Sequence, residues 1–150
     1  MNHVLTGCDE VFGPWMAEKL GTVWQPGRGH IIGLGDPEIG LPVAGAWFES
    51  WNGSSVMCHF ATDGKNRLTR EFLWFICYYP FEQLKARKVI SPIEEDNQAS
   101  RRWVEKFGLT LEATLKDAAP KGDLLLYTIT KEQCKWLHLR EKSSGKTIST

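Results

Sequence analysis

DNQASRRWVEKFGL, residues 96–109, predicts a short amphipathic helix with a defined beginning and end. Asp96 or Asn97 can begin the helix, because a short side-chain oxygen accepts hydrogen bonds from the free backbone N–H groups of the first turn. Gly108 can end it, because glycine adopts without strain the left-handed conformation that commonly follows a helix. Apolar side chains recur every four residues between these ends, at Ala99, Trp103 and Phe107.

Runs of apolar and β-branched residues flank this helix. One run precedes it at residues 88–93, and two follow it at residues 110–115 and 124–130. Their length and composition predict strands. The last two strands are joined by a loop that contains Pro120-Lys121-Gly122, a typical turn sequence.

The end of the chain predicts a helix followed by a disordered tail. Thr130 and Gln133 have the spacing of a capping box, in which two side chains satisfy each other's backbone N–H groups, so a last helix is expected over residues 131–142. Residues 143–150 carry almost no apolar side chain and are expected to be disordered. Residues 1–142 are therefore expected to form one domain.

The N-terminal half predicts one helix and three strands. Residues 9–20 are expected to form a helix that ends at Gly21 and is interrupted near Gly13-Pro14. Its expected apolar face consists of Val11, Trp15 and Leu20. Apolar runs separated by turn residues then predict an antiparallel meander at 30–34, 41–50 and 55–61.

A buried helix is expected between the two halves. Thr69 can cap residues 70–79, which are apolar nearly all round and so should be covered on most sides. Pro80 is expected to end this helix, because a proline disfavours helical backbone at the residue before it. Residues 81–87 are expected to form a helical turn that leads into the next strand.

The order of these elements predicts a mixed α/β (α+β) fold class. A strand, a helix and a further strand in sequence require a parallel pair, here residues 55–61 with residues 88–93, because a crossover connection is needed between parallel strands. The remaining neighbours are expected to be antiparallel. We therefore expect a central, mostly antiparallel sheet of about six strands with helices on both faces.

Composition and charge exclude several classes of protein. The formal net charge is zero, so nothing global indicates a nucleic acid or an anionic membrane as a partner. The sequence has no apolar run of about 18 residues, so no membrane span is expected, and the N-terminus lacks the pattern of a secretory signal. The four cysteines lie far apart and are expected to be buried free thiols in a reducing cytoplasm rather than disulfides or a metal site.

The C-terminal part of the chain resembles a known family. An asparagine that opens a helix ending in Gly plus an apolar residue, preceded by one strand and followed by two, resembles the C-terminal half of the GNAT superfamily of N-acetyltransferases. The resemblance covers residues 68–137 and is greatest to the branch of the ribosomal-protein N-terminal acetyltransferases. Within that branch it is similar to short phage-type acetyltransferases that end like DLLLYTITKEQCKWL, residues 123–137. It implies the GNAT fold, in which the parallel strand pair splays apart around acetyl-CoA.

The resemblance implies a phosphate site at residues 62–70, where a strand meets a helix N-terminus. The helix dipole and exposed N–H groups favour a phosphate there, and Lys65, Arg67 and Arg70 add positive charge. The family usually has a glycine-rich loop at this place, whereas here Gly64 is the only glycine. The rest of that loop is replaced by Asn66, Arg67, Leu68 and Thr69. The alternative interpretation is a solvated basic loop.

The resemblance also implies contacts with the rest of the cofactor. Asn97 and Ser100 are expected to reach the pantetheine arm, although Asn97 can equally be a plain helix cap. Arg101 and Val104 follow on the same helix. Val104 occupies the place where many relatives carry a tyrosine that protonates the leaving thiolate. Phe60 and Ala61 on strand 55–61 are expected to bind the cofactor, and backbone N–H groups of this strand are expected to stabilise the oxyanion.

Three side chains are candidates for the proton transfers. His59 lies on the strand that lines the substrate cleft in the family, and its ordinary pKa suits a general base near neutral pH. Glu49 is a second candidate base, or else a surface carboxylate. Tyr127 is a candidate acid, or else a core tyrosine. Relatives build the acceptor pocket in the N-terminal half, which here holds Trp15, Trp24, Trp47 and Trp51.

The function implied is an acetyl-CoA-dependent N-acetyltransferase in which an amine attacks the thioester directly in a ternary complex, without a metal. The acceptor can be a small molecule, a protein N-terminus or a lysine. A nucleic acid is expected as an acceptor only through the amine of a modified base. One alternative is a catalytically inactive GNAT-like module that binds a protein or an acyl-CoA. Another is a viral host-interaction protein. The expected location is the cytoplasm, or the host cytoplasm if the protein is viral, and a homodimer is an open alternative to a monomer.

Overall fold

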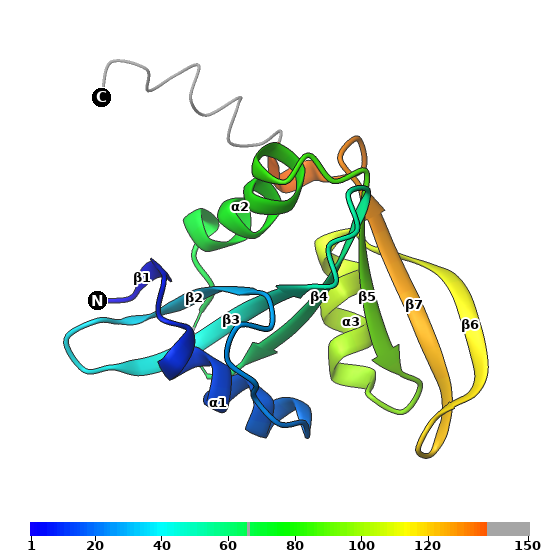
Figure 1. The fold of residues 1–150 in the computed structure, drawn as a ribbon, viewed down its shortest axis with the longest axis horizontal. Coiled ribbons are helices and arrows are strands. Elements are labelled where there is room, and N and C mark those ends of the chain that lie inside the picture. The colour runs from blue at the N-terminus through cyan, green and yellow to red at the C-terminus, as the bar shows by residue number, and fades with distance from the viewer. Residues whose placement is uncertain (66, 138–150) are drawn as a thin grey trace.

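One seven-stranded sheet runs through the protein, and the computed structural model describes residues 1–65 and 67–137 (Figure 1). The strand order is β1-β2-β3-β4-β5-β7-β6, and all neighbours are antiparallel except β4 and β5. The strands are β1 (His3–Thr6), β2 (His30–Asp36), β3 (Leu41–Glu49), β4 (Ser55–Thr62), β5 (Lys88–Glu94), β6 (Thr110–Ala119) and β7 (Gly122–Thr130). The helical elements are α1 (Asp9–Leu20), α2 (Arg70–Tyr78), a π-helical turn η1 (Tyr79–Gln83) and α3 (Gln98–Phe107).

The predicted fold class is confirmed, including the parallel pair between β4 and β5. The sheet has one strand more than expected, because His3–Thr6 pairs with β2 along its outer edge. Four residues are too few to show the period-two alternation that indicates a strand. In the part of the chain that the structure describes, no helix is long and apolar enough to span a membrane.

Helix α1 has the predicted bounds, and Gly21 ends it with a φ of 72°. The predicted apolar face was wrong at Val11, which is 51% exposed, whereas Trp15 and Leu20 pack against an apolar cluster whose buried α1 residues are Phe12 and Met16. The small residue Gly13 explains the difference, since a Cβ there would collide with the indole of Trp24. The helix therefore turns its Gly13 side toward the protein, and Pro14 is accommodated without a break.

Helix α2 begins as predicted, with the Thr69 hydroxyl accepting a hydrogen bond from Phe72 N–H at 3.1 Å. Pro80 does not end the helical path as expected. It follows the last α-helical residues and lies inside η1, where Leu84 N–H donates to Tyr79 C=O at 3.0 Å. A π-helical turn tolerates the proline because the wider hydrogen-bonding pattern passes over the missing N–H group.

The C-terminal capping box is half formed. Thr130 N–H donates to the Gln133 side chain at 3.0 Å, as predicted. The helix does not start at residue 131, because residues 131–133 form a turn and helical backbone begins at residue 135. The remainder of the expected helix and the expected tail lie outside the described residues.

Two apolar clusters cover the two faces of the sheet. The larger cluster joins the sheet to α2 and α3, and the smaller one joins it to α1 (Figure 1). Strand β4 contributes alternately to both, because successive side chains of a strand point to opposite faces. Phe60 packs with the larger cluster and Ala61 with the smaller. A side chain on β4 can therefore act on either face of the sheet.

Candidate active site

Strands β4 and β5 diverge after three paired positions, which opens a cleft in the middle of the sheet. Pairing runs only from Ser55 with Lys88 to Met57 with Ile90, whereas β4 continues to Thr62. Figure 1 shows the two strands separating toward their C-terminal ends. The second half of β4 thus has a sheet partner, β3, on one side only.

Pro92 explains why the pairing stops. If the parallel register continued, the carbonyl of Cys58 would accept its next hydrogen bond from the backbone N–H of residue 92. Proline has no N–H, so this bond cannot form. The hydroxyl of Ser91 donates to Cys58 C=O instead, at 2.9 Å. Pro92 therefore ends the hydrogen-bonded pairing of β4 with β5, and Ser91 supplies the hydrogen bond that the Cys58 carbonyl would otherwise lack.

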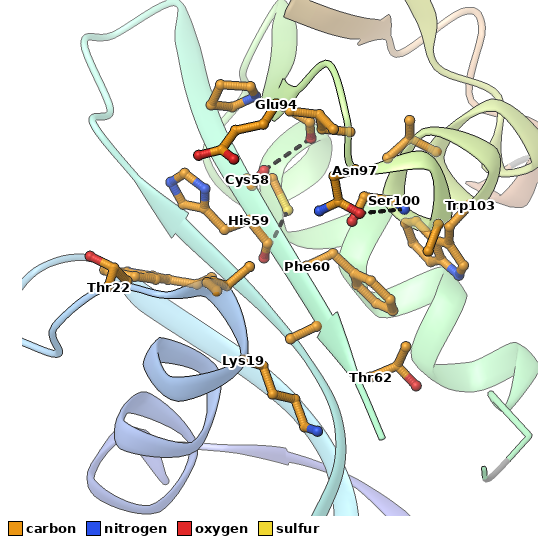
Figure 2. Close-up of a pocket in the computed structure, with 18 of the residues that line it drawn as sticks. Lys19, Thr22, Cys58, His59, Phe60, Thr62, Glu94, Asn97, Ser100 and Trp103 are labelled. Carbon is orange, nitrogen blue, oxygen red and sulfur yellow. Dashed lines mark hydrogen bonds between the residues drawn. The ribbon is translucent and has the colours of Figure 1, made fainter. Parts of the chain in front are cut away.

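The cleft widens into a cavity of about 660 Å³ that reaches both faces of the sheet. Figure 2 shows His59 and Phe60 on opposite sides of β4, with Asn97 and Ser100 on the side of Phe60. The cavity is lined on the α1 face by residues including Lys19, Thr22, Arg28, Trp47, Glu49 and His59. It is lined on the α3 face by residues including Cys58, Phe60, Asn97, Ser100, Trp103 and Val104.

A buried carboxylate organises the α1 face. Glu49 is only 7% exposed, so its alternative interpretation as a surface carboxylate is wrong. Its Oε1 accepts a hydrogen bond from Arg28 at 3.2 Å. Its Oε2 lies 3.4 Å from His59 Nε2 and makes no regular hydrogen bond with a described residue. The carboxylate therefore connects a fixed cation to an imidazole at the cavity wall.

The loop before β2 delivers Arg28 to this carboxylate. Gly29 lies against β3, where an added Cβ would collide with the carbonyl of Phe48, and its φ is 87°. The Trp47 indole donates to Arg28 C=O at 2.6 Å, which fixes the backbone of the loop. The Arg28 guanidinium also lies 5.7 Å from the centroid of the Trp47 ring.

His59 is held in its neutral form by its surroundings. Burial lowers the pKa of His59 below the ordinary 6.5, and the charge of Arg28 lowers it further. The charge of Glu49 raises the pKa and offsets part of this effect. The side chain keeps 23% of its surface exposed, and it packs against Trp47 with ring centroids 5.4 Å apart. A neutral imidazole that is open to a cavity can accept a proton near neutral pH.

Aromatic side chains dominate the α3 face. The rings of Phe60 and Trp103 stack across the open side of β4, with centroids 3.7 Å apart and planes 12° apart. Trp103 stacks in turn on Phe107, one helical turn further along α3. Val104, which replaces the tyrosine of many relatives, is buried beside them. The α3 face of the cavity therefore offers aromatic rings on which a ligand can stack. Helix α3 contributes no titratable side chain to the cavity lining.

Polar groups on the α3 face come from a helix start and from backbone. The Asn97 side chain accepts a hydrogen bond from Ser100 N–H at 3.2 Å, which confirms the predicted cap. On β4, Asp63 N–H donates to Val43 C=O of β3, whereas Cys58 C=O faces β5. Because these directions alternate along a strand, the N–H groups of Phe60 and Thr62 face the open cleft, whereas that of Ala61 faces β3.

The predicted phosphate loop lies just beyond the Thr62 end of the cavity. Lys65, Arg67 and Arg70 are exposed and have no ion pair with any residue in the described ranges. Asp63 Oδ1 accepts from Lys65 N–H at 2.9 Å, and Gly64 has a φ of 72°. Leu68 packs against the larger cluster and Thr69 caps α2. Asn66 lies outside the described residues.

Besides the predicted phosphate loop, Tyr127 and Arg101 do not line the cavity. The hydroxyl of Tyr127, which is 1% exposed, donates to Glu105 at 2.8 Å. Arg101 donates to Glu95 C=O at 3.0 Å and to the Tyr127 hydroxyl at 3.4 Å. Both side chains are therefore engaged behind α3. The structure does bring His59, Glu49, Phe60, Ala61, Asn97, Ser100 and Val104 to the cavity.

Sequence reasoning missed Arg28, Ser91 and Pro92. Arg28 lies in a loop without a motif, so no local signal marked it. Pro92 could have been recognised from the sequence, because a proline inside an expected strand marks a position that has no backbone N–H to donate to a neighbouring strand.

Comparison with known proteins supports the fold. No protein-family model and no curated protein matches the sequence. A solved structure of a mutant spermidine N-acetyltransferase SpeG from Vibrio cholerae is 14% identical, covers 91% of this chain and 97% of its own, and has a TM-score of 0.69. SpeG with manganese ions is 13% identical over 88% and 92%, with a TM-score of 0.64. A GNAT-family acetyltransferase from Bacillus anthracis is 18% identical over 68% of this chain and 66% of that one, with a TM-score of 0.57.

At these identities the likeness establishes the fold, which is that of the GNAT acetyltransferases. Within residues 1–65 and 67–137 no cluster of three or more potential metal ligands occurs. The similarity to the ribosomal-protein branch and to phage-type proteins stays a prediction from the sequence.

Proposed function

We propose that this protein is an acetyl-CoA-dependent N-acetyltransferase that transfers the acetyl group to a primary amine by direct attack in a ternary complex. One observation carries the proposal: the cavity passes through the sheet and has different chemistry on its two faces. The α3 face presents backbone donors and aromatic surface, whereas the α1 face presents a neutral imidazole beside a carboxylate. A donor and an acceptor entering from opposite faces would meet where β4 and β5 separate.

The residues of the α3 face fit the proposed cosubstrate. Acetyl-CoA, when bound, supplies the acetyl group as a thioester. The free edge of β4 can bind an extended amide-containing arm, because the N–H of Thr62 faces the cleft beyond that of Phe60. Asn97 and Ser100 add polar groups at the same place, and the basic loop at Lys65 and Arg67 suits phosphates next to the start of α2.

His59 is proposed as the general base. Glu49 lies on the Nε2 side of the ring, which leaves Nδ1 to take a proton from the acceptor ammonium, directly or through water. Glu49 would hold the ring in place and stabilise the positive charge that forms on it. The N–H of Phe60 would donate to the oxygen on which negative charge develops.

The chain offers no tyrosine at the place of Val104 to protonate the leaving group. A thiolate leaves readily near its own pKa, so water can supply the proton. The acceptor is proposed to be an amine-bearing small molecule or a protein N-terminus or lysine. Spermidine is the acceptor named for the SpeG neighbours, and whether it is used here is a matter for a substrate screen.

The first experiment is calorimetric titration with coenzyme A and with pantetheine, which lacks the phosphates. Replacing both Lys65 and Arg67 by Ala is expected to weaken coenzyme A binding about tenfold or more and to leave pantetheine binding unchanged. Lys121→Ala, an exposed charge on the β6–β7 turn, is the matched control. Equal losses for both ligands would remove the phosphate-site assignment. Product formation from acetyl-CoA in an amine screen then tests catalysis.

A second candidate function is a module that binds an acyl-CoA or a protein without catalysis. The stacked Phe60 and Trp103 rings favour this module, because they occupy part of the α3 face. The absence of a tyrosine at position 104 also favours it. Binding of acetyl-CoA without product in a broad amine screen would support this module and contradict the enzyme.

A further inference from the structure

Two cysteine sulfurs meet in the core at a place that the proposed reaction does not use. The Sγ atoms of Cys77 in α2 and Cys134 after β7 lie 2.8 Å apart, although the residues are 57 positions apart in sequence. This separation is within about 1 Å of the length of a disulfide bond. Cys77 is 2% exposed and Cys134 is fully buried. All four cysteines of the chain are free thiols.

The two thiols have different surroundings. Cys134 directly precedes the helical backbone that starts at residue 135. Its hydrogen bond with Cys77 lowers the pKa of Cys134, burial raises it, and bonds from the backbone N–H groups of Leu137 and Trp136 lower it again. Burial raises the pKa of Cys77 far above its ordinary value. Cys134 lies after a turn outside the sheet, whereas Cys77 lies inside α2, so we assign Cys134 as the attacking sulfur and Cys77 as the sulfur that completes the bond.

We infer that Cys77 and Cys134 form a reversible disulfide that ties α2 to the segment after β7. The oxidant is a small disulfide such as oxidised glutathione. The Cys134 thiolate attacks one glutathione sulfur, a mixed disulfide forms and one glutathione leaves. Cys77 gives up its proton and attacks Cys134 Sγ, which forms the protein disulfide and releases the second glutathione. Two protein thiols are oxidised, and one glutathione disulfide is reduced to two thiols.

Access to Cys134 comes from local opening of its own segment. Residues 131–133, directly before Cys134, form a turn outside the sheet, and such segments open more easily than core strands. Cys58 lines the cleft and is the nearer thiol to solvent, yet burial raises its pKa to about 12, which disfavours its thiolate. Cys8 packs with the α1 cluster on the opposite face of the sheet. Cys58 lies near Cys77 on the α3 face, but the sulfur in direct contact with Cys77 is that of Cys134.

The crosslink would close a loop that contains β5, α3, β6 and β7, of which β5 and α3 line the cleft. A disulfide that closes a long loop stabilises a protein chiefly by restricting the unfolded chain. Oxidation is therefore expected to raise the Tm of this protein by about 5–15 °C.

The test treats the folded full-length chain with oxidised glutathione and then blocks the remaining thiols. Two of the four thiols are expected to disappear, a peptide linking Cys77 to Cys134 is expected in the digest, and dithiothreitol is expected to restore all four. Cys134→Ser and Cys77→Ser are each expected to abolish the linked peptide and the rise in Tm. Cys8→Ser and Cys58→Ser are the controls and are expected to change neither.

Three results would overturn the inference. The first is that all four thiols of the folded wild-type chain survive across a range of glutathione ratios. The second is a linked peptide that joins a different pair. The third is a stable mixed disulfide on Cys134 without loss of the Cys77 thiol. All three are read on the wild-type chain, so they do not depend on whether a serine variant folds.

Discussion

The functional groups on the two faces of the cleft are held in place by different kinds of interaction. On the α1 face, side chains far apart in sequence are fixed to one another, with Arg28 on Glu49 and Glu49 beside His59. On the α3 face, the polar groups belong to the backbone of β4 and to a helix start, and the side chains are mainly aromatic. Substitutions on the α1 face should therefore change chemistry, whereas those on the α3 face should change binding.

The difference has an electrostatic basis. A buried carboxylate is costly unless it is paired, and Arg28 supplies the pairing for Glu49 while remaining half exposed itself. Backbone N–H groups need no such counter-charge, because they are neutral dipoles fixed by the strand. The α1 face can be tuned by pH for this reason, and the α3 face cannot.

The largest expected effect is on the α1 face. His59→Gln is expected to lower kcat at neutral pH by about 100-fold to 10,000-fold, because it removes the proposed base. The loss is expected to shrink at high pH, where more of the acceptor amine is already free. Rates of product formation from pH 6 to pH 10 check this, with acetyl-CoA affinity as the control that the α3 face is intact. A constant ratio of wild-type to variant rate would exclude His59 as base.

The next effect concerns the loop that delivers Arg28. Gly29→Ala is expected to destabilise the protein by about 2–4 kcal/mol, because the added Cβ meets the Phe48 carbonyl and the backbone is left-handed. Gly27→Ala is the matched control. Its φ of 82° is similar, but open space surrounds the added Cβ, so it should cost only about 1 kcal/mol. Urea unfolding of both variants measures the difference, and equal costs would show that the loop is not pressed against β3.

Opposite pH shifts are expected for the two charges next to His59. Arg28 lowers the pKa of His59, so Arg28→Gln should raise it and move the acid limb of kcat/KM to higher pH. Glu49 raises the pKa, so Glu49→Gln should lower it and move that limb to lower pH. Titration of the His59 resonance by NMR gives the same two signs independently of turnover, and shifts of the same sign would contradict the arrangement.

Much of the fold could be predicted because its signals are local. The α3 helix has its cap at Asn97, its apolar stripe and its terminal Gly108 within one short stretch. The parallel pair followed from the order of elements alone. The four-residue strand β1 could not be predicted, since it is defined by pairing with β2 rather than by a pattern of its own.

The candidate site was predicted only where it coincides with an element. His59, Phe60 and Asn97 lie on a strand or at a helix start, and their faces follow from periodicity. Arg28 could not be predicted, because its position depends on a loop path set by the contact of Gly29 with β3. Tyr127 lies on the expected strand, but only the packing of α3 reveals that Glu105 accepts its hydrogen bond.

The smallest expected effect concerns Ser91 and Pro92, at the point where β4 and β5 separate. Ser91→Ala should cost about 1 kcal/mol, because Cys58 C=O loses its donor. Pro92→Ala restores an N–H at the position where the parallel ladder would supply the next bond, so the double variant should recover most of that loss. The expected coupling is therefore about 1 kcal/mol in a double-mutant cycle by urea unfolding. Additive costs would show that Pro92 does not end the pairing.

Binding gives the second readout of the same cycle. If Pro92→Ala extends the pairing of β4 with β5 by one hydrogen bond, the cleft narrows beside the edge proposed to hold the cosubstrate. Acetyl-CoA affinity should then fall about two- to tenfold, the worth of one net hydrogen bond, while stability stays nearly unchanged because Ser91 already satisfies the Cys58 carbonyl. Ser91→Ala alone should leave affinity nearly unchanged, because it removes a bond without closing the cleft. A Pro92→Ala variant that keeps its stability and loses affinity would show that the missing N–H of Pro92 keeps the strand pair apart beside the cosubstrate.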